Sequence, residues 1–336
     1  MRRILVFALF APAFVALTAC DGEPPAASHS SVILSVATTG SVVEGRPDTG
    51  ASFIEPGAAS GSLLYVSDLG NFDVRVFTYP ALKPAGKLTG FVQPQGECVD
   101  RAGNIWIANS EGTDLREYAH GGTKEIARVS DALGYPAGCA VDPKSGNLAV
   151  TNIENFSGNA NVLVYKRARG TPAVYGNTNL VSFYFAAYDS QGNLYVSARS
   201  SQSAFSLGVL ARGAHSIALV TLSGGTIYFP GTVAWSGTQL VLGDQRCKNT
   251  ASSCLYRLTV SGKTARIAGA TPLGGACDVA QAWISAARVA GGDYANCSHK
   301  GSSADLWPYP AGGRPTARVT GFTQPVGAVV SSAGGS

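Results

Sequence analysis

From residue 61 onward, short runs of apolar residues alternate with turns rich in Asp, Gly and Asn. Leu64–Val66 and Ile105–Ile107 have the composition of half-buried strands, and Val162–Tyr165 follows the same pattern after a variable loop. A more polar segment, Thr316–Thr320, is typical of an outermost strand. Gly and Asn tolerate the positive φ of tight turns, and Asp hydrogen-bonds its own turn. The pattern predicts an all-β chain without helical periodicity.

One group of residues returns along the chain at a roughly regular interval. Gln93–Ala108 is repeated as Tyr135–Val150 and, more loosely, as Phe185–Val196. Each copy contains a short apolar strand, a turn of Asp, Gly and Asn, and a second apolar strand. Weaker copies lie at 230–242, 275–284 and 324–331. The mean spacing of about 46 residues fits the four-stranded blade of a β-propeller.

The two ends of the repeat region are incomplete in complementary ways. The first unit opens at its second strand, Leu63–Ser67, because Glu55–Ala59 leaves no room for a full innermost strand. The chain finishes on an unpaired innermost strand, Val326–Ser331. We therefore expect one closed domain, residues 61–336, in which the C-terminal strand completes the first blade. The predicted fold is an all-β, six-bladed β-propeller of four-stranded blades.

The repeated motif resembles that of NHL-repeat and gluconolactonase-like six-bladed propellers. Its consensus here is P-x-G-x-x-V-D-x-x-G-N-[IL]-x-V, and the resemblance covers roughly residues 61–331. Such scaffolds carry many unrelated functions. The resemblance therefore implies a fold and leaves the activity open.

The N-terminus is typical of an exported bacterial lipoprotein. Basic Met1–Arg3 precedes fourteen apolar residues, Ile4–Leu17, which are too few to span a bilayer but suit a secretory signal. Leu17–Cys20 resembles the bacterial lipobox, in which the signal is cut before the cysteine and the thiol is acylated. We expect a signal peptide over 1–19, lipidation at Cys20 and a flexible tether over 20–60. The alternative is a plain signal peptide with a chance cysteine.

The charge balance offers no attraction for nucleic acid. Only 14% of the residues are charged, against roughly 25% in an ordinary soluble domain. A chain that begins at Cys20 has 23 basic and 21 acidic residues. No apolar run after the leader approaches membrane length, so the expected membrane contact is the lipid at Cys20.

The remaining cysteines are expected to form disulfides, because exported chains meet oxidising conditions. Cys247 and Cys254 flank one loop, which suits a hairpin staple. Cys98 and Cys139 follow their repeat glycines by two residues and by one, so their side chains point to opposite faces of neighbouring blades and can meet. The third pair would then be Cys277 with Cys297. A metal cluster is the alternative, but no C-x-x-C or His-rich spacing supports it.

The resemblance makes a metal-dependent hydrolase or lactonase the alternative function. Gluconolactonase-like propellers hold a divalent metal, commonly Ca²⁺, through acidic and amide residues just before the repeat glycines. Here the residues at those positions are Gln95, Ala137, Pro230, Gly274 and Val326, and none is Asn, Asp or Glu. Glu97 and Asp278 lie near the predicted channel mouth, but Ca²⁺ takes six or more oxygen ligands. We expect no cofactor for the leading function. Ca²⁺ is expected only if the protein is a hydrolase or lactonase.

The loop after the second strand varies most between copies, which is typical of a recognition surface on a rigid scaffold. Its candidate contact residues are Phe72, Phe156, Arg199 and Tyr294, with ordinary loop packing as the alternative. The sequence has no G-x-S-x-G elbow, no H-E-x-x-H and no phosphate loop. We therefore expect a non-catalytic binding or scaffold module of the cell envelope, anchored on the periplasmic side or at the cell surface. Its expected partner is a protein, a peptide or a glycan.

Overall fold

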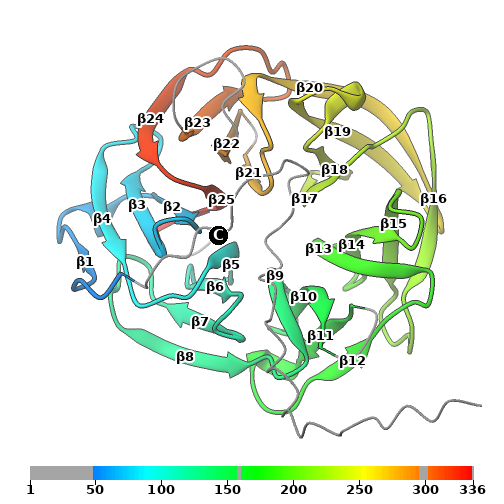
Figure 1. Ribbon diagram of the computed structural model, residues 1–336, viewed down its shortest axis with the longest axis horizontal. Coiled ribbons are helices and arrows are strands. Elements are labelled where there is room, and N and C mark those ends of the chain that lie inside the picture. The colour runs from blue at the N-terminus through cyan, green and yellow to red at the C-terminus, as the bar shows by residue number, and fades with distance from the viewer. Residues whose placement is uncertain (1–47, 157–159, 286, 295–301, 335–336) are drawn as a thin grey trace, which may run out of the picture. The chain divides into compact units, whose positions relative to one another are not determined.

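The computed structural model describes residues 48–156, 160–285, 287–294 and 302–334. Its β-sheets stand around a common centre, and their innermost strands converge on it (Figure 1). Helical structure in this part of the chain is limited to three short 3₁₀ turns at Ala58–Ser60, Lys166–Ala168 and Cys247–Asn249. The structure is a β-propeller, as the repeats predict.

The first sheet joins the two ends of the repeat region. It contains β1 (Phe53–Ile54), β4 (Pro84–Leu88), β3 (Asp73–Thr78), β2 (Leu63–Asp68) and β25 (Pro325–Ser331), in that order. Strand β25 is antiparallel to β2, with Leu63 opposite Ser331. The prediction that the C-terminal strand completes the first blade is confirmed.

The short strand β1 lies inside the segment that the sequence analysis assigned to the tether. It pairs with β4, where Ile54 is opposite Gly86. A Cβ built on Gly86 would lie 2.1 Å from the Phe53 carbonyl oxygen, so the close approach requires glycine. Asp48 adds an ion pair with Lys87. The folded unit therefore begins before residue 60, and the signal peptide and Cys20 lie outside the described residues.

Three further sheets have four antiparallel strands each. The first contains β5 (Pro94–Val99), β6 (Ile105–Asn109), β7 (Asp114–Tyr118) and β8 (Glu125–Ser130). The second contains β9 (Gly134–Val141), β10 (Leu148–Asn155), β11 (Val162–Tyr165) and β12 (Ala173–Tyr175). The third contains β21 (Ala282–Ile284), β22 (Arg288–Asp293), β23 (Ser302–Pro308) and β24 (Ala317–Phe322).

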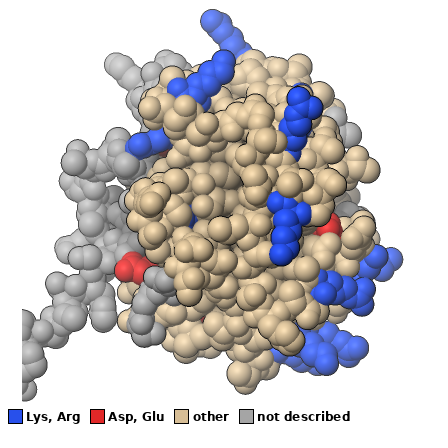
Figure 2. Space-filling model, turned by 90° about the vertical axis from the view of Figure 1, so that its right-hand side faces the viewer, with Lys and Arg blue, Asp and Glu red and all other residues tan. Residues whose placement is uncertain are grey.

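The remaining sheet has eight strands and consists of two antiparallel halves. One half is β13 (Leu180–Tyr188), β14 (Leu194–Ser200), β15 (Phe205–Leu210) and β16 (Ala218–Ser223). The other is β17 (Pro230–Ser236), β18 (Gln239–Asp244), β19 (Ser252–Ser261) and β20 (Thr264–Cys277). The halves join where Thr221–Ser223 runs parallel to Thr264–Arg266. Hydrogen bonding therefore defines five sheets rather than six separate ones. Figure 2 shows this side of the molecule, where Lys and Arg side chains are spread over the surface with few acidic ones between them.

The repeat glycines lie where innermost strands approach each other. Strands β25, β5, β9, β13, β17 and β21 contact one another in this cyclic order. A Cβ on Gly96 would lie 2.6 Å from the Ala137 carbonyl oxygen, and a Cβ on Gly138 would lie 2.7 Å from that of Tyr184. A Cβ on Gly327 would lie 2.2 Å from the Gln95 carbonyl oxygen. These three glycines of the sequence repeat thus occur where neighbouring innermost strands come too close to leave room for a Cβ.

The copy assigned to 275–284 is displaced in the structure. Gly275 lies within β20, the long outer strand of the preceding half-sheet, and Cys277 pairs with Ser252 there. The innermost strand of the last sheet is β21, which begins at Ala282. Asp278 therefore lies in the link between β20 and β21 rather than at the start of an innermost strand.

Two of the predicted disulfides are present. Cys98 on β5 is bonded to Cys139 on β9, which joins two sheets, with a Cα–Cα distance of 5.6 Å. Cys247 is bonded to Cys254 across one loop. Cys277 is disulfide-bonded as well, and Cys297 lies outside the described residues.

Candidate functional site: the long-loop face and the ring centre

The described residues of the loops that join β2 to β3, β6 to β7, β10 to β11, β14 to β15 and β18 to β19 lie on one side of the ring. We call this side the long-loop face. Buried acids and amides at the ends of the second strands fix these loops. Asp68 accepts hydrogen bonds from the backbone N–H groups of Thr323 and Gln324, at 3.0 and 2.7 Å. Asp244 likewise accepts from the backbone of Phe229, at 3.0 Å. These acids are structural, and in the sequence each of them directly follows an apolar strand segment.

Two arginines flank one aromatic ring on this face. The guanidinium carbon of Arg199 lies 5.3 Å from the centroid of Phe229, and that of Arg246 lies 5.6 Å from the same centroid. Tyr184 packs edge-on against Phe229, with centroids 5.7 Å apart. Cation–π contacts of this kind contribute about 0.5–1 kcal/mol each at exposed sites. They orient both guanidinium groups, whose N–H donors suit carboxylates.

An apolar cluster lies on the same face, between β8 and β10. Phe156 is 51% exposed and its ring meets Tyr135 edge-on, with centroids 4.9 Å apart. Leu133 is 38% exposed, and its carbonyl oxygen accepts a hydrogen bond from the Phe156 N–H. Large apolar side chains gathered on a surface are a common mark of protein contact sites. Phe156 is thus exposed, as the sequence analysis expected.

Phe72 does not belong to the exposed set. Only 5% of Phe72 is accessible, and neighbouring Leu69 is 2% accessible. The Asn71 side chain donates to Asp68 and accepts a hydrogen bond from Thr323, so the loop is held against the link before β25. This bonding leaves the loop's apolar side chains turned inward. Phe72 therefore packs within its own loop, which is the alternative that the sequence analysis left open, and it is not a contact residue of this face.

Asp278 and Tyr294 lie close enough for the charge of Asp278 to affect the pKa of Tyr294. Burial raises the pKa of Asp278 to about 6, and the nearby Arg246 opposes this shift. Burial also raises the pKa of Tyr294, and the charge of Asp278 raises it further. Asp278 therefore lies near Arg246, and Tyr294 lies near Asp278. Of the predicted site residues, the structure brings these two, Asp278 and Tyr294, together.

Glu97 is buried at the ring centre and not at an open mouth. Ser67 donates a hydrogen bond of 2.6 Å to Glu97 Oε1. The Gln281 side chain accepts from the Glu97 N–H at 2.8 Å and donates to its carbonyl oxygen at 2.6 Å. Burial raises the pKa of the Glu97 carboxyl group to about 8, against the opposing effect of Ser67. Burial therefore favours the protonated form of Glu97, which joins β5 to Ser67 of β2 and to Gln281 in the link before β21.

The pKa shifts of Glu97 and Asp278 have different causes besides burial. The pKa of Glu97 responds to burial and Ser67, whereas that of Asp278 responds to burial and Arg246. No group of three or more His, Cys, Asp or Glu side chains in the described ranges is arranged to hold a metal ion. Gln95, which precedes the first repeat glycine, is fully buried, and neither of its side-chain amide atoms has a hydrogen-bond partner among the described residues.

Comparison with known proteins identifies the fold. No protein-family model and no curated protein sequence matches the chain. Among solved structures, a chain from a nidogen/laminin complex aligns with a TM-score of 0.63 at 13% identity, covering 81% of this chain and 99% of that one. A protein of unknown function from Bacteroides caccae aligns with a TM-score of 0.61 at 12% identity, over the same shares of both chains. The likeness confirms a β-propeller.

Among the described residues, no helix is long and apolar enough to cross a bilayer.

Proposed function

We propose that this protein is a lipid-anchored, six-bladed propeller that binds a partner protein through its long-loop face without catalysing a reaction. The count of six treats the eight-stranded sheet as two blades, which is supported by its two antiparallel halves and by the cyclic contacts of six innermost strands. The disulfides support an oxidising compartment outside the cytoplasm. Lipidation at Cys20 rests on the lipobox.

The observation that carries the binding proposal is the combination of the arginine pair over Phe229 with exposed Phe156. Aromatic side chains and arginine are enriched in protein interfaces and dominate their energetics. The similar chain in a nidogen/laminin complex adds that a propeller of this arrangement occurs in a protein–protein complex. A partner segment that combines acidic and apolar side chains would complement this face.

Site-specific crosslinking tests the binding face. A photoreactive amino acid replaces Phe156 in one variant and Leu219, which is 43% exposed on the outer strand β16, in a control variant. We expect a protein adduct, identified by mass spectrometry of the cell envelope fraction, at position 156 and not at 219. Adding Arg199→Ala should weaken the adduct. The same adducts at both positions, adducts to glycan alone or none at either position would contradict the proposal.

Metabolic labelling tests the anchor separately. Incorporation of radioactive palmitate is expected in the wild type and absent after Cys20→Ser. Label in both proteins, or in neither, would contradict lipidation at Cys20.

The lactonase alternative, which would use Glu97 and Asp278 to hold a metal ion, has its own test. Stoichiometric Ca²⁺ in the purified protein, together with lactone hydrolysis that chelators abolish, would replace the binding proposal.

A further inference from the structure

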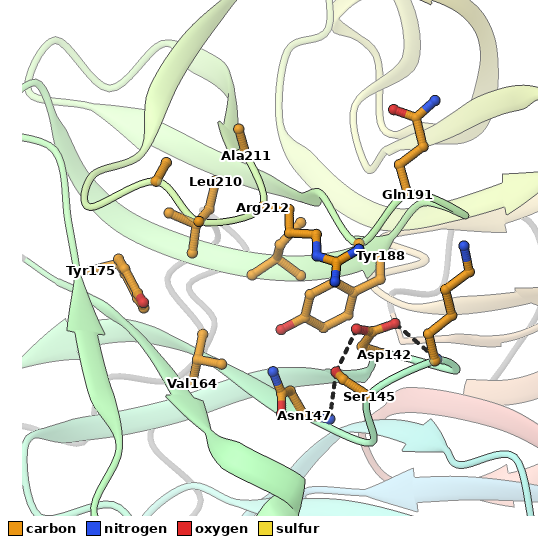
Figure 3. Close-up of a pocket in the computed structure, with 15 residues that line it drawn as sticks. Asp142, Ser145, Asn147, Val164, Tyr175, Tyr188, Gln191, Leu210, Ala211 and Arg212 are labelled. Carbon is orange, nitrogen blue, oxygen red and sulfur yellow. Dashed lines mark hydrogen bonds between the residues drawn. The ribbon is translucent and has the colours of Figure 1, made fainter.

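A cavity of about 330 Å³ lies between the sheet of β9–β12 and the half-sheet of β13–β16. Figure 3 shows the residues that line it. They include the turns that join β9 to β10 and β13 to β14, so the cavity lies at the opposite end of the strands from the loops that follow the second strands. Val164 on β11, Leu194 on β14 and Leu210 on β15 form an apolar wall. The volume is within the range of small-molecule sites, about 300–1,000 Å³.

Two polar groups point into this cavity with unused hydrogen-bonding capacity. Figure 3 shows the Tyr188 ring crossing the cavity, with Asn147 beneath it and Tyr175 on the far side. Among the described residues, the Tyr188 hydroxyl has no hydrogen-bond partner. The side-chain oxygen Oδ1 of Asn147 accepts from the Arg167 backbone N–H at 3.1 Å, and no described residue accepts from the Asn147 side-chain NH₂ group. Burial, reinforced by the charge of Asp142, raises the pKa of Tyr188, so its hydroxyl remains a donor.

The rim of the cavity carries more positive than negative charge. Lys144 and Arg212 line it together with one acid, Asp142. The Asp142 carboxylate already accepts hydrogen bonds from the Lys144 N–H at 3.0 Å and from the Ser145 hydroxyl at 2.5 Å. In the part of the chain that the structure describes, ion pairs involve Arg75, Lys87, Arg116, Arg128 and Arg318, and neither Lys144 nor Arg212.

A second cavity of about 860 Å³ adjoins the first and extends the apolar surface. The two share Tyr188, Gln191, Ala211 and Ala214. Tyr195 and Trp235 line the second cavity and meet edge-on, with centroids 5.4 Å apart. The body of a ligand can therefore extend past Tyr188 along an aromatic surface.

We propose that this cavity binds a small organic carboxylate with an apolar or aromatic body. The body would contact Val164, Leu194 and Leu210, the apolar groups that line the wall. The carboxylate would accept hydrogen bonds from the Tyr188 hydroxyl and lie within reach of the Arg212 guanidinium group. Hydrogen bonds to charged groups contribute more than neutral ones, about 1.5–3 kcal/mol. An uncharged ligand of the same shape would therefore bind more weakly.

Calorimetric titration of the purified full chain with 3-phenylpropionate tests this site, with 3-phenylpropionamide as the uncharged match. We expect saturable binding of the acid and about tenfold or weaker affinity for the amide, which corresponds to about 1.4 kcal/mol. Arg212→Ala should weaken binding of the acid about tenfold while leaving binding of the amide unchanged. Tyr188→Phe keeps the aromatic ring and removes the hydroxyl group, so it should lower the affinity for 3-phenylpropionate by about threefold to tenfold.

Arg266→Ala provides the matched control, because Arg266 is an exposed arginine on β20 outside both cavities. It should leave both affinities unchanged, and thermal melting should show that all variants are folded. Equal affinity for acid and amide, equal effects of Arg212→Ala and Arg266→Ala, or no saturable binding of the acid would each overturn the proposal. None of these outcomes affects the proposed partner site, which lies at the other end of the strands.

Discussion

Single residues show how far chemistry can be inferred from a sequence. Glu97 is notable in the sequence because it stands one place after a repeat glycine, and it does lie at the ring centre. Its burial depends on Ser67 and Gln281, and Gln281 is 184 residues away along the chain. A contact at that separation leaves no local pattern. The sequence therefore identified the position and could not distinguish a metal ligand from a buried structural acid.

Replacing Glu97 by Gln should remove part of the pH dependence of stability. The pKa of Glu97 is about 8 in the folded protein and near 4.5 in the unfolded chain, so the folded state holds a proton that the unfolded state loses in between. Between these values the free energy of unfolding should fall by up to about 1.4 kcal/mol per pH unit as pH rises. Glu97→Gln should flatten this slope, so the stability of the variant relative to the wild type should be greater at pH 8 than at pH 5.

Urea unfolding of both proteins at pH 5, 6, 7 and 8 measures this difference. Asp73 and Asp131, whose pKa values burial raises to about 6, are present in both proteins and cancel in the comparison. If the free energies of unfolding of the two proteins changed in parallel with pH, the raised pKa of Glu97 would be contradicted.

At the scale of elements, most strands could be predicted and a few could not. Three repeat glycines, Gly96, Gly138 and Gly327, are visible in the sequence because each lies where one innermost strand approaches the next too closely for a Cβ. Strand β1 was missed because two residues give no alternation, and its place depends on Gly86 in another strand. The displaced copy at 275–284 arose because Gly275 matches the repeat glycine by residue type while lying on an outer strand.

Substituting a repeat glycine should therefore destabilise the whole ring. In Gly138→Ala the new Cβ would lie 2.7 Å from the Tyr184 carbonyl oxygen and 2.9 Å from the Phe185 ring, so β9 and β13 must separate. Overpacking of this kind costs about 1–3 kcal/mol. Gly61→Ala is the control, because no atom lies within 4 Å of its Cβ and its φ is −117°. Equal urea midpoints for the two variants would contradict this explanation of the repeat.

At the scale of the whole molecule, the ring depends on contacts between the two ends of the folded region. Strand β25 pairs with β2 and contacts β5 and β22 on either side. Beyond the strand pairing, His120 Nδ1 lies 2.7 Å from the Ser331 hydroxyl, and His120 Nε2 lies 3.0 Å from the Gly61 carbonyl oxygen. The incomplete ends of the repeat predicted this closure, whereas the fusion of two half-sheets through β16 and β20 involves three residue pairs without a sequence signature.

Truncation after Gln324 should abolish cooperative folding of the ring. Strand β25 buries four apolar side chains, Val326, Ala328, Val329 and Val330, each at most 6% exposed. At about 1.5–3 kcal/mol for each buried valine, their loss is comparable with the whole stability of a typical domain, about 5–15 kcal/mol. It would also expose the edge of β2, an apolar strand prone to pair with other chains.

Circular dichroism during heating should show no sharp transition after this truncation. Truncation after Ser332, which spares β25, should melt like the full chain. An unchanged melting temperature after the longer truncation would mean that the sheets form an open arc, and the positions assigned to Glu97 and the glycines at the centre would need another explanation.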